Sequence, residues 1–224
     1  MTIRSASRHN LRHSCELAHL DLWVLGGVPN GGTHFGGEGG HGVLILSPRA
    51  VKRLETYVPN WPIPKLFRLT NDGKLNEGIF GSETINTPSM LVVEDAIDAL
   101  SWAKSIGGLP ALIARSEASL EVVKAWVKTT PFFSFLAEDP ATISNTSITL
   151  TITDPWFVGL DNAEKAATAA RVIKSLENEG VALDAASYRN APPGIRIWAG
   201  PTVETSDVAA LLPWLDWAYS GIAH

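Results

Sequence analysis

The sequence has 224 residues, of which 45% are hydrophobic and 18% charged, with a formal net charge of -5 and a pI near 5.7. This acidic balance argues against a nucleic-acid-binding protein, which usually carries a basic patch and a high pI. The single cysteine, Cys15, excludes a disulfide within the chain, and no apolar run is long enough to span a membrane. We therefore expect a globular protein of one large or two small domains in a reducing compartment.

Residues 1–42 differ from the rest of the chain because they include a glycine-rich run at positions 26–42. Glycines in this run match GxGxxG, the dinucleotide-binding pattern. A strand-like apolar run follows the motif, where the pattern requires a helix, so we discount a dinucleotide site. His34, Glu38 and His41 fit no standard zinc spacing, and we expect a loop without a metal ion.

The next part of the chain predicts short elements with a long connection between them. Val43–Ser47 is a mostly apolar run typical of a buried strand, and Pro48–Thr56 favours a short helix. Val58–Leu69 contains three prolines and is expected to be an extended loop. Asn71–Gly73 has the composition of a turn.

An amphipathic helix is predicted to begin at Ser89, and a glycine pair at 107–108 should end it. Its apolar residues share one face: Met90, Val93, Ile97 and Leu100. Asn86 and Thr87 come just before this helix, where free backbone N–H groups and the positive end of the helix dipole suit a phosphate. Simple N-capping, which Asn and Thr also perform, stays open as the alternative.

The second half of the chain predicts alternating helices and strands. A helix is expected to begin at Ser116, and Ser147–Thr153 alternates as a half-buried strand does. A helix should run from a capping box at Asp161 to Glu179, with its inner face formed by Ala163, Ala166, Ala170, Ile173 and Leu176. A short strand at 195–198 and a final helix capped by Thr205 or Ser206 complete a compact α/β or α+β unit.

Two arginines near the short strand are candidates for binding an acid. Ile195 and Ile197 should face the core, which leaves Arg196 and Trp198 on the opposite face. Arginine presents a planar fork that matches a carboxylate or phosphate, so Arg189 and Arg196 form a plausible acid-binding pair. The alternative is that both are solvated surface arginines.

Seven stretches from Gly36 onward are collinear with a known family: GGEGGHGVLILSPRAVKRLE, PIPKLFRLT, GKLNEGIF, ETINTPSMLVVEDAIDAL, WAKSIGGLPALIAR, DPATISNTSI and YRNAPPGIRIWAGPTVETSDVAALLPWLDWA. In these stretches the chain resembles the C-terminal half of a phosphoserine aminotransferase of the alphaproteobacterial type. The resemblance implies an α/β protein with the aspartate-aminotransferase-like fold of pyridoxal-phosphate-dependent transferases. It implies an incomplete large domain followed by a small C-terminal α/β domain.

The resemblance also implies a reaction and a cellular setting. Members of the family are cytoplasmic homodimers that use pyridoxal 5'-phosphate. They transfer the amino group of glutamate to 3-phosphohydroxypyruvate, giving phosphoserine and 2-oxoglutarate in serine biosynthesis. Some also accept a phosphorylated hydroxythreonine in pyridoxine biosynthesis, and the sequence does not separate the two substrates. We expect small-molecule partners and neither nucleic acid nor membrane.

The resemblance assigns domains and residue roles. Residues 1–42 would be an atypical N-terminal segment, 43–115 a remnant of the large cofactor-binding domain, and 116–224 the small domain. By resemblance, Asn86 and Thr87 reach the cofactor phosphate of the other subunit. Arg196 matches the arginine that holds the substrate carboxylate, and Arg189 resembles a basic residue near the substrate phosphate.

One required residue is missing from its expected place. The family holds its cofactor as a Schiff base on a lysine, and the corresponding position here is Thr33. No lysine precedes Lys52, and the stretches with Lys52 and Lys65 match non-catalytic parts of the family. The missing lysine argues against transamination by this chain alone.

Three interpretations follow from the sequence. The chain is a family member by descent, an independent transaminase, or a non-catalytic remnant or dimerising half of a split enzyme. A truncated or frame-shifted gene would explain the missing part. In that case we expect exposed apolar surface around Val43–Leu46 and along Met90–Leu100, together with self-association.

Overall fold

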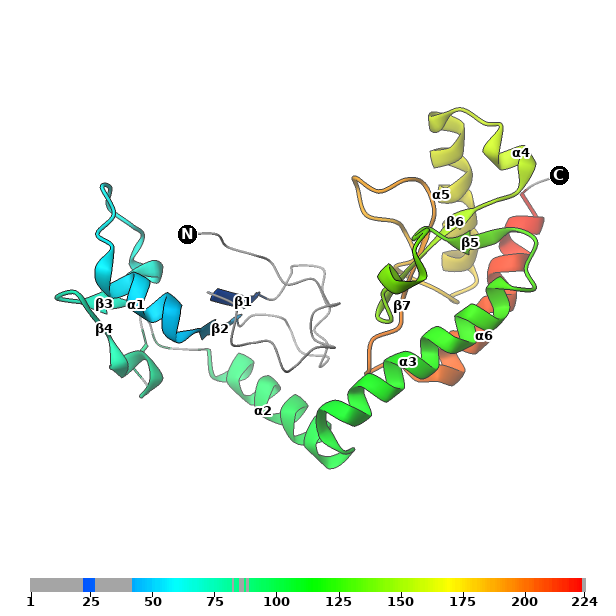
Figure 1. The fold of residues 1–224 in the computed structure, drawn as a ribbon. Helices are drawn as coiled ribbons and strands as arrows, with labels where there is room; N and C mark the ends of the chain where they lie inside the picture. The colour runs from blue at the N-terminus through cyan, green and yellow to red at the C-terminus, as the bar shows by residue number, and fades with distance from the viewer. Residues whose placement is uncertain (1–21, 27–41, 82, 85–86, 88, 223–224) are drawn as a thin grey trace. The chain divides into compact units, whose positions relative to one another are not determined.

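The computed structural model describes residues 22–26, 42–81, 83–84, 87 and 89–222. The chain divides into two compact units, residues 1–100 and 101–224 (Figure 1). The predicted glycine-rich loop lies almost entirely outside the described residues. The predicted three-domain division at 42 and 115 stays a prediction.

The first unit begins with an antiparallel pair of strands. β1 (Leu22–Gly26) pairs with β2 (Gly42–Leu46), with Leu22 opposite Leu46 and Gly26 opposite Gly42. β2 confirms the strand predicted after the glycine run. β1 was not anticipated, because a single run of four apolar residues and a glycine carries no alternating pattern.

The predicted short helix is present as α1 (Pro48–Thr56). Ser47 caps it, with its hydroxyl accepting a hydrogen bond from Ala50 N at 3.1 Å, and Pro48 occupies the first turn, where no backbone N–H is needed. The proline-rich stretch after it contains one short 3₁₀ turn, η3 (Lys65–Phe67).

The predicted turn at Asn71–Gly73 is a two-residue hairpin turn. It joins β3 (Thr70–Asn71) to β4 (Lys74–Leu75), and both central residues have positive φ, 50° for Asp72 and 77° for Gly73. This is the geometry whose twist matches a β-hairpin, and aspartate and glycine tolerate it best. A second 3₁₀ turn, η4 (Glu77–Phe80), follows.

Two helices follow in close succession. α2 (Met90–Ser105) confirms the predicted amphipathic helix, and glycines 107 and 108, with φ of 115° and 68°, end it. α3 (Gly108–Val127) then begins at once. The predicted helix start at Ser116 is therefore wrong: this serine lies within α3, is 3% exposed and is not a cap. The sequence before it contains Pro110, which is compatible with a first helical turn.

The second unit contains a three-stranded antiparallel sheet in the order β5-β6-β7. Its strands are β5 (Phe133–Phe135), β6 (Ser147–Ile152) and β7 (Ile195–Trp198). A 3₁₀ turn, η5 (Pro140–Thr142), lies between the first two. β6 alternates between buried and half-buried residues, as its sequence predicts. This alternation gives the sheet one core face and one outer face.

Helices cover the core face of this sheet. α5 (Asn162–Asn178) begins with the predicted capping box between Asp161 and Glu164, after a single turn, α4 (Pro155–Val158). α6 (Thr205–Ser220) packs against both α3 and α5. The core contains fully buried side chains from strands and helices, among them Val123, Ile148, Leu150, Val172, Leu176, Ile195 and Leu215.

The inner face of α5 differs from its prediction. Ala163, Ala166 and Ala170 are exposed, whereas the buried residues are Thr168, Ala169, Val172 and Leu176. Alanines occur on both faces of this helix, and burial of a methyl group contributes too little free energy to decide which face packs against the core. The larger Val172 and Leu176 determine which side packs.

Candidate functional site

The candidate site lies on the outer face of β7. Ile195 and Ile197 point into the core and are 0% and 4% exposed, as predicted. Arg196 lies opposite Thr149 of β6, on the other face of the sheet. It is only 5% exposed, so the interpretation of Arg196 as a solvated surface arginine is wrong. A buried guanidinium requires compensating partners.

The partners of Arg196 come from the loop that precedes β7. Its Nη2 donates to the carboxylate Oδ2 of Asp184 at 2.6 Å and to the backbone oxygen of the same residue at 3.3 Å. Its Nε donates to the backbone oxygen of Ala186 at 3.2 Å. The ring of Tyr188 lies 4.9 Å from the guanidinium carbon, in cation–π range. The guanidinium is thus held by main chain, carboxylate and ring together.

Local geometry fixes this loop against the strand. The backbone N–H of Arg196 donates to Ala185 O at 2.9 Å, and Ala186 forms an isolated bridge with Ile195. At Gly194, an added Cβ would lie 2.3 Å from the backbone oxygen of Leu150. Only glycine permits this close approach between the start of β7 and the central strand. The position of the Arg196 guanidinium is therefore fixed by backbone contacts of the loop and strand as well as by the hydrogen bonds of the arginine side chain.

Arg189 belongs to the same loop but stays in solvent. Ala191 N donates to Tyr188 O at 2.9 Å, which closes a turn with Arg189 near its tip. Arg189 is exposed, and no ion pair joins it to another described residue. The turn begins at Tyr188, the residue that contacts the Arg196 guanidinium. Both predicted arginines therefore lie on one continuous loop and strand.

Asp184 and Tyr188 were missed from the sequence. Asp184 contacts the guanidinium through its carboxylate and its backbone oxygen, Ala186 through its backbone oxygen, and Tyr188 through its ring. These contacts depend on how the loop folds back beside β7, where Ala186 bridges to Ile195. No pattern within the sequence marks them.

The predicted cofactor residues are described only in part. Thr87 is exposed and lies three positions before Met90, the first residue of α2, as expected. Asn86 and Thr33 lie outside the described residues, as do His34, Glu38 and His41. Lys52 on α1 and Lys65 on η3 are both exposed.

The described part of the chain shows neither a metal site nor a membrane span. No group of three or more histidine, cysteine or acidic side chains gathers there to hold a metal ion. Among the helices of that part, none combines the length and apolar character needed to cross a bilayer.

Sequence comparison relates the chain to one family of enzymes. It is 50% identical over 184 residues to the phosphoserine aminotransferase of Methanosarcina mazei, and the match spans 82% of this chain but 47% of the relative. The protein of the same name from Methanosarcina barkeri is 50% identical over 185 residues, with 83% and 47% covered. The chain thus spans about half the length of the curated relatives it matches. No protein-family model matches it.

Solved structures support the fold. A phosphoserine aminotransferase from Cytophaga hutchinsonii superposes with a TM-score of 0.65 at 19% identity, covering 88% of this chain and 49% of the other. That from Bacillus circulans gives a TM-score of 0.53 at 16% identity, covering 64% and 36%. The mixed helix and sheet structure is consistent with an incomplete aspartate-aminotransferase-like fold, as predicted. In sequence and in fold, the chain is therefore similar to the C-terminal portion of the phosphoserine aminotransferases, over about half of their length.

Proposed function

We propose that this chain supplies the acid-binding part of a cytoplasmic, homodimeric phosphoserine aminotransferase. The proposed reaction is transfer of an amino group from glutamate to 3-phosphohydroxypyruvate, with pyridoxal 5'-phosphate as cofactor. Both Methanosarcina relatives carry the name of this activity at 50% identity. The proposal is carried by one observation, the buried guanidinium of Arg196.

Arg196 is suited to bind a substrate carboxylate. It is the one buried arginine among the described residues, and its guanidinium lies on the sheet face opposite the core. Two backbone carbonyls hold its orientation, so little side-chain entropy is lost when an anion binds. An oriented guanidinium fixes the carboxylate, and with it the neighbouring carbon that carries the amine or ketone.

Arg189 would contribute a second cationic contact from the same loop. Its exposed side chain lies on the turn that begins at Tyr188, which contacts Arg196. A carboxylate on Arg196 and a phosphate on Arg189 would together select substrates with both groups. Phosphoserine and 3-phosphohydroxypyruvate have this chemistry.

The residues present fit the cofactor only in part. The Thr87 hydroxyl and the Asn86 amide are donors suited to a phosphate. A Schiff base requires a lysine amine, and the hydroxyl of Thr33 cannot form one. The chain's own residues therefore do not fit the covalently held group, and we propose that the chain alone does not transaminate.

An absorbance titration of the purified chain with pyridoxal phosphate tests this conclusion. We expect no aldimine band, and after borohydride reduction mass spectrometry should find no lysine that carries the cofactor. The chain should still bind phosphoserine, with Arg196→Gln abolishing that binding. A defined labelled lysine, together with turnover of glutamate and 3-phosphohydroxypyruvate, would show that the chain is an independent enzyme. Phosphoserine binding unaffected by Arg196→Gln would refute the role of the arginine.

A second function is favoured by the exposed face of α2. Met90, Ile97 and Leu100 share one face of this helix and are 63%, 52% and 58% exposed, which is unusual for large apolar side chains. This face favours a non-catalytic subunit or a half of a split enzyme that associates through it. Co-expression with the part of the Methanosarcina mazei protein that the chain does not match would test this. Formation of a stable complex with transaminase activity is the supporting result, and two separate proteins on size exclusion would count against it.

A further inference from the structure

The ion pair at Arg196 is strongly asymmetric in burial. The arginine side chain is 6% exposed, whereas the side chain of its partner, Asp184, is 78% exposed. A buried guanidinium depends on its counter-ion, because an uncompensated buried charge is costly. An exposed carboxylate depends much less on its cation, since water solvates it well. If this ion pair breaks, the free-energy cost therefore comes mainly from the buried guanidinium and not from the exposed carboxylate.

The hydrogen bonds of the guanidinium divide into two kinds. Nε donates to Ala186 O, and Nη2 donates to the backbone oxygen and to the carboxylate of Asp184. The two bonds to main chain hold the arginine in place whatever the Asp184 side chain does. The Asp184 carboxylate accepts from the guanidinium through a single hydrogen bond, between its Oδ2 and Nη2 of Arg196. Nη1 donates to none of the described residues, so the bidentate mode of arginine is unused.

We propose that Asp184 is a displaceable counter-ion of Arg196. In the free protein the Asp184 carboxylate neutralises the buried guanidinium, and an incoming ligand carboxylate takes its place. The ligand can bond to Nη1 and Nη2 together, while Asp184 turns into solvent. Asp184 is thus a positioning residue that stabilises the empty site and competes with the ligand. This inference rests on the proposed function, in which Arg196 binds the substrate carboxylate.

Competition of this kind predicts opposite effects on stability and affinity. In Asp184→Asn the guanidinium loses its counter-ion but keeps both backbone bonds. The full-length variant should unfold at a lower temperature than wild type when no ligand is present. It should bind O-phospho-L-serine about tenfold more tightly, because the ligand carboxylate no longer competes with the charge of Asp184. Saturating phosphoserine should also raise its unfolding temperature more than that of wild type.

Two matched controls isolate the carboxylate. O-Phosphoethanolamine has the phosphate and amine of phosphoserine without its carboxylate, and its binding should not change in Asp184→Asn. Glu121→Gln removes one negative charge from an exposed pair with Lys124 in the same unit. This variant should match wild type in stability and in affinity for phosphoserine. Equal phosphoserine affinity in wild type and Asp184→Asn would overturn the proposal.

The displacement of Asp184 can also be tested in the wild-type protein, so that the test does not require a variant to fold. Addition of phosphoserine should shift the ¹³C carboxyl resonance of Asp184 to that of a solvated carboxylate, and phosphoethanolamine should not. An unchanged resonance while phosphoserine binds through Arg196 would overturn the displacement and leave the proposed function intact. Binding that survives Arg196→Gln would instead overturn the proposed function itself. The two failures are therefore distinguishable.

Discussion

Single residues in the second unit show how burial controls chemistry. Tyr219 is 0% exposed, and its ring lies 4.9 Å from that of Phe132 and 5.8 Å from that of Phe133, measured between centroids. Its hydroxyl is buried and finds no hydrogen-bond partner among the residues that the structure describes. Burial, with a smaller effect from the charge of Asp154, raises the pKa of Tyr219 from 10.0 to about 12. The ring stabilises the core while the hydroxyl does not.

We expect Tyr219→Phe to be as stable as wild type at neutral pH, or more stable by about 1 kcal/mol, because it removes an unpaired buried hydroxyl. The pH dependence has a defined sign. The folded-state pKa of Tyr219 lies above its unfolded value, so its contribution to stability is complete below pH 10 and is lost as the pH rises towards 12. In this window wild type should lose up to about 1.4 kcal/mol per pH unit through this group, and the variant should not.

Urea unfolding of both proteins at several pH values between 8 and 12 measures this difference. Tyr219→Leu is the matched control, because it loses the ring contacts with Phe132 and Phe133 as well as the hydroxyl. That variant should be destabilised by about 2–4 kcal/mol. A destabilised Tyr219→Phe would mean that the hydroxyl has a partner in solution.

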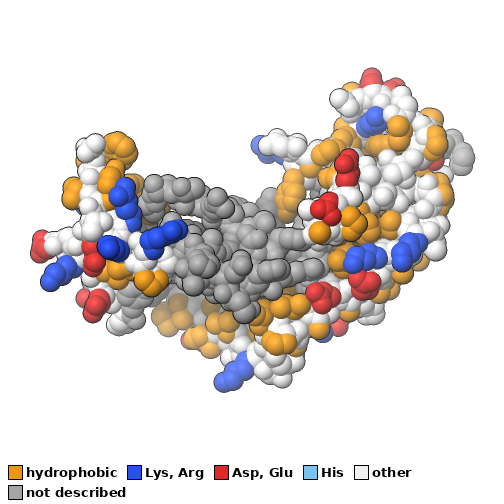
Figure 2. All heavy atoms as spheres, viewed as in Figure 1, with side chains coloured by type: hydrophobic (Ala, Val, Ile, Leu, Met, Phe, Trp, Pro, Cys, Tyr) orange, Lys and Arg blue, Asp and Glu red, His pale blue; other side chains and the backbone are white. Residues whose placement is uncertain are grey.

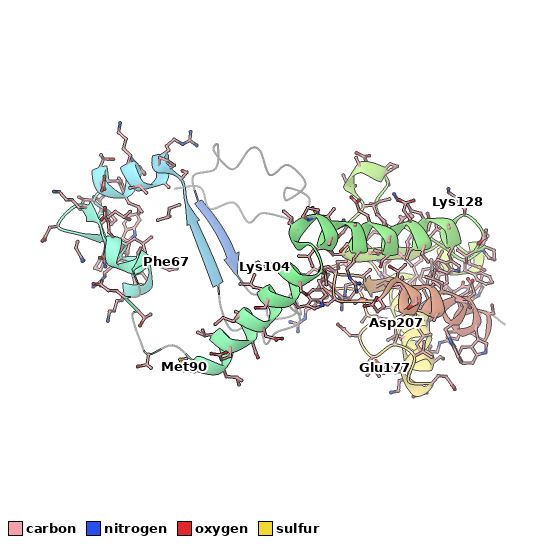
Figure 3. The ribbon with its side chains drawn as sticks, turned by 90° about the horizontal axis from the view of Figure 1, so that it is seen from below. Phe67, Met90, Lys104, Lys128, Glu177 and Asp207 are labelled. Carbon is pink, nitrogen blue, oxygen red and sulfur yellow. The ribbon has the colours of Figure 1, made fainter. Side chains whose placement is uncertain are left out.

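At the scale of elements, α2 differs from the other long helices. Its large apolar residues are the ones that its sequence places on one face, and they are exposed: Met90, Val93, Ile97 and Leu100. Figure 2 shows hydrophobic side chains at the surface over α2, and Figure 3 marks Met90 and Lys104 near its two ends. The buried residues of α2 are Ala99 and Ala103, at 8% and 5% exposure. The prediction of exposed apolar surface along Met90–Leu100 is therefore confirmed. The side chains of Val43–Ile45 lie outside what the structure describes.

We expect Met90→Glu with Leu100→Lys to reduce self-association of the chain without loss of helix content. Both residues are exposed, and the new glutamate lies in the first turn, where the helix dipole favours a negative charge, so the free energy of unfolding should change by less than about 0.5 kcal/mol. Sedimentation velocity and binding of a hydrophobic dye would measure the effect. Ala99→Lys, in the same helix but 8% exposed, should instead destabilise the protein. Unchanged self-association in the double variant would mean that the chain associates through a surface other than the apolar face of α2.

At the scale of the whole molecule, the two units differ in the core that they contain. The residues of the second unit form one contiguous core from α3, α5, α6 and the sheet. In the described part of the first unit, the buried apolar residues are Ala50 and Ala99, while Tyr57, Val58, Trp61 and Phe67 are all more than two-fifths exposed. Segments with few buried contacts open at low free energy.

Limited proteolysis with chymotrypsin should therefore cut first after Tyr57 and Phe67, both of which are exposed. The second unit should persist longer, because its backbone must unfold before cleavage. Trp214 and Trp217 provide an internal control, since they are 38% and 50% exposed but lie in α6, which packs on α3 and α5. Mass spectrometry of early fragments would show the order. First cuts at Trp214 or Trp217 would contradict the proposed difference in local stability.

Local signals in the sequence determined most of the elements of this protein. Proline at the first turn of α1, the Asp72–Gly73 turn and the Asp161–Glu164 capping box act within a few residues, so their outcome does not depend on distant chain. The resemblance to the phosphoserine aminotransferases also came from the sequence, through seven collinear stretches. Where local signals were ambiguous, as for Ser116 or the alanines of α5, packing against other elements decided the result.

The tertiary structure alone decided the state of the candidate site. The sequence predicted that Arg196 lies on the face opposite the isoleucines, because alternation along a strand is local. That Arg196 is buried, and that Asp184 and Tyr188 surround it, depends on a loop that returns alongside β7. Gly194 permits that return by its close approach to β6. Contacts between segments that the chain brings together only on folding carry no signature in either segment alone, which is why the counter-ion of Arg196 became visible only in the folded structure.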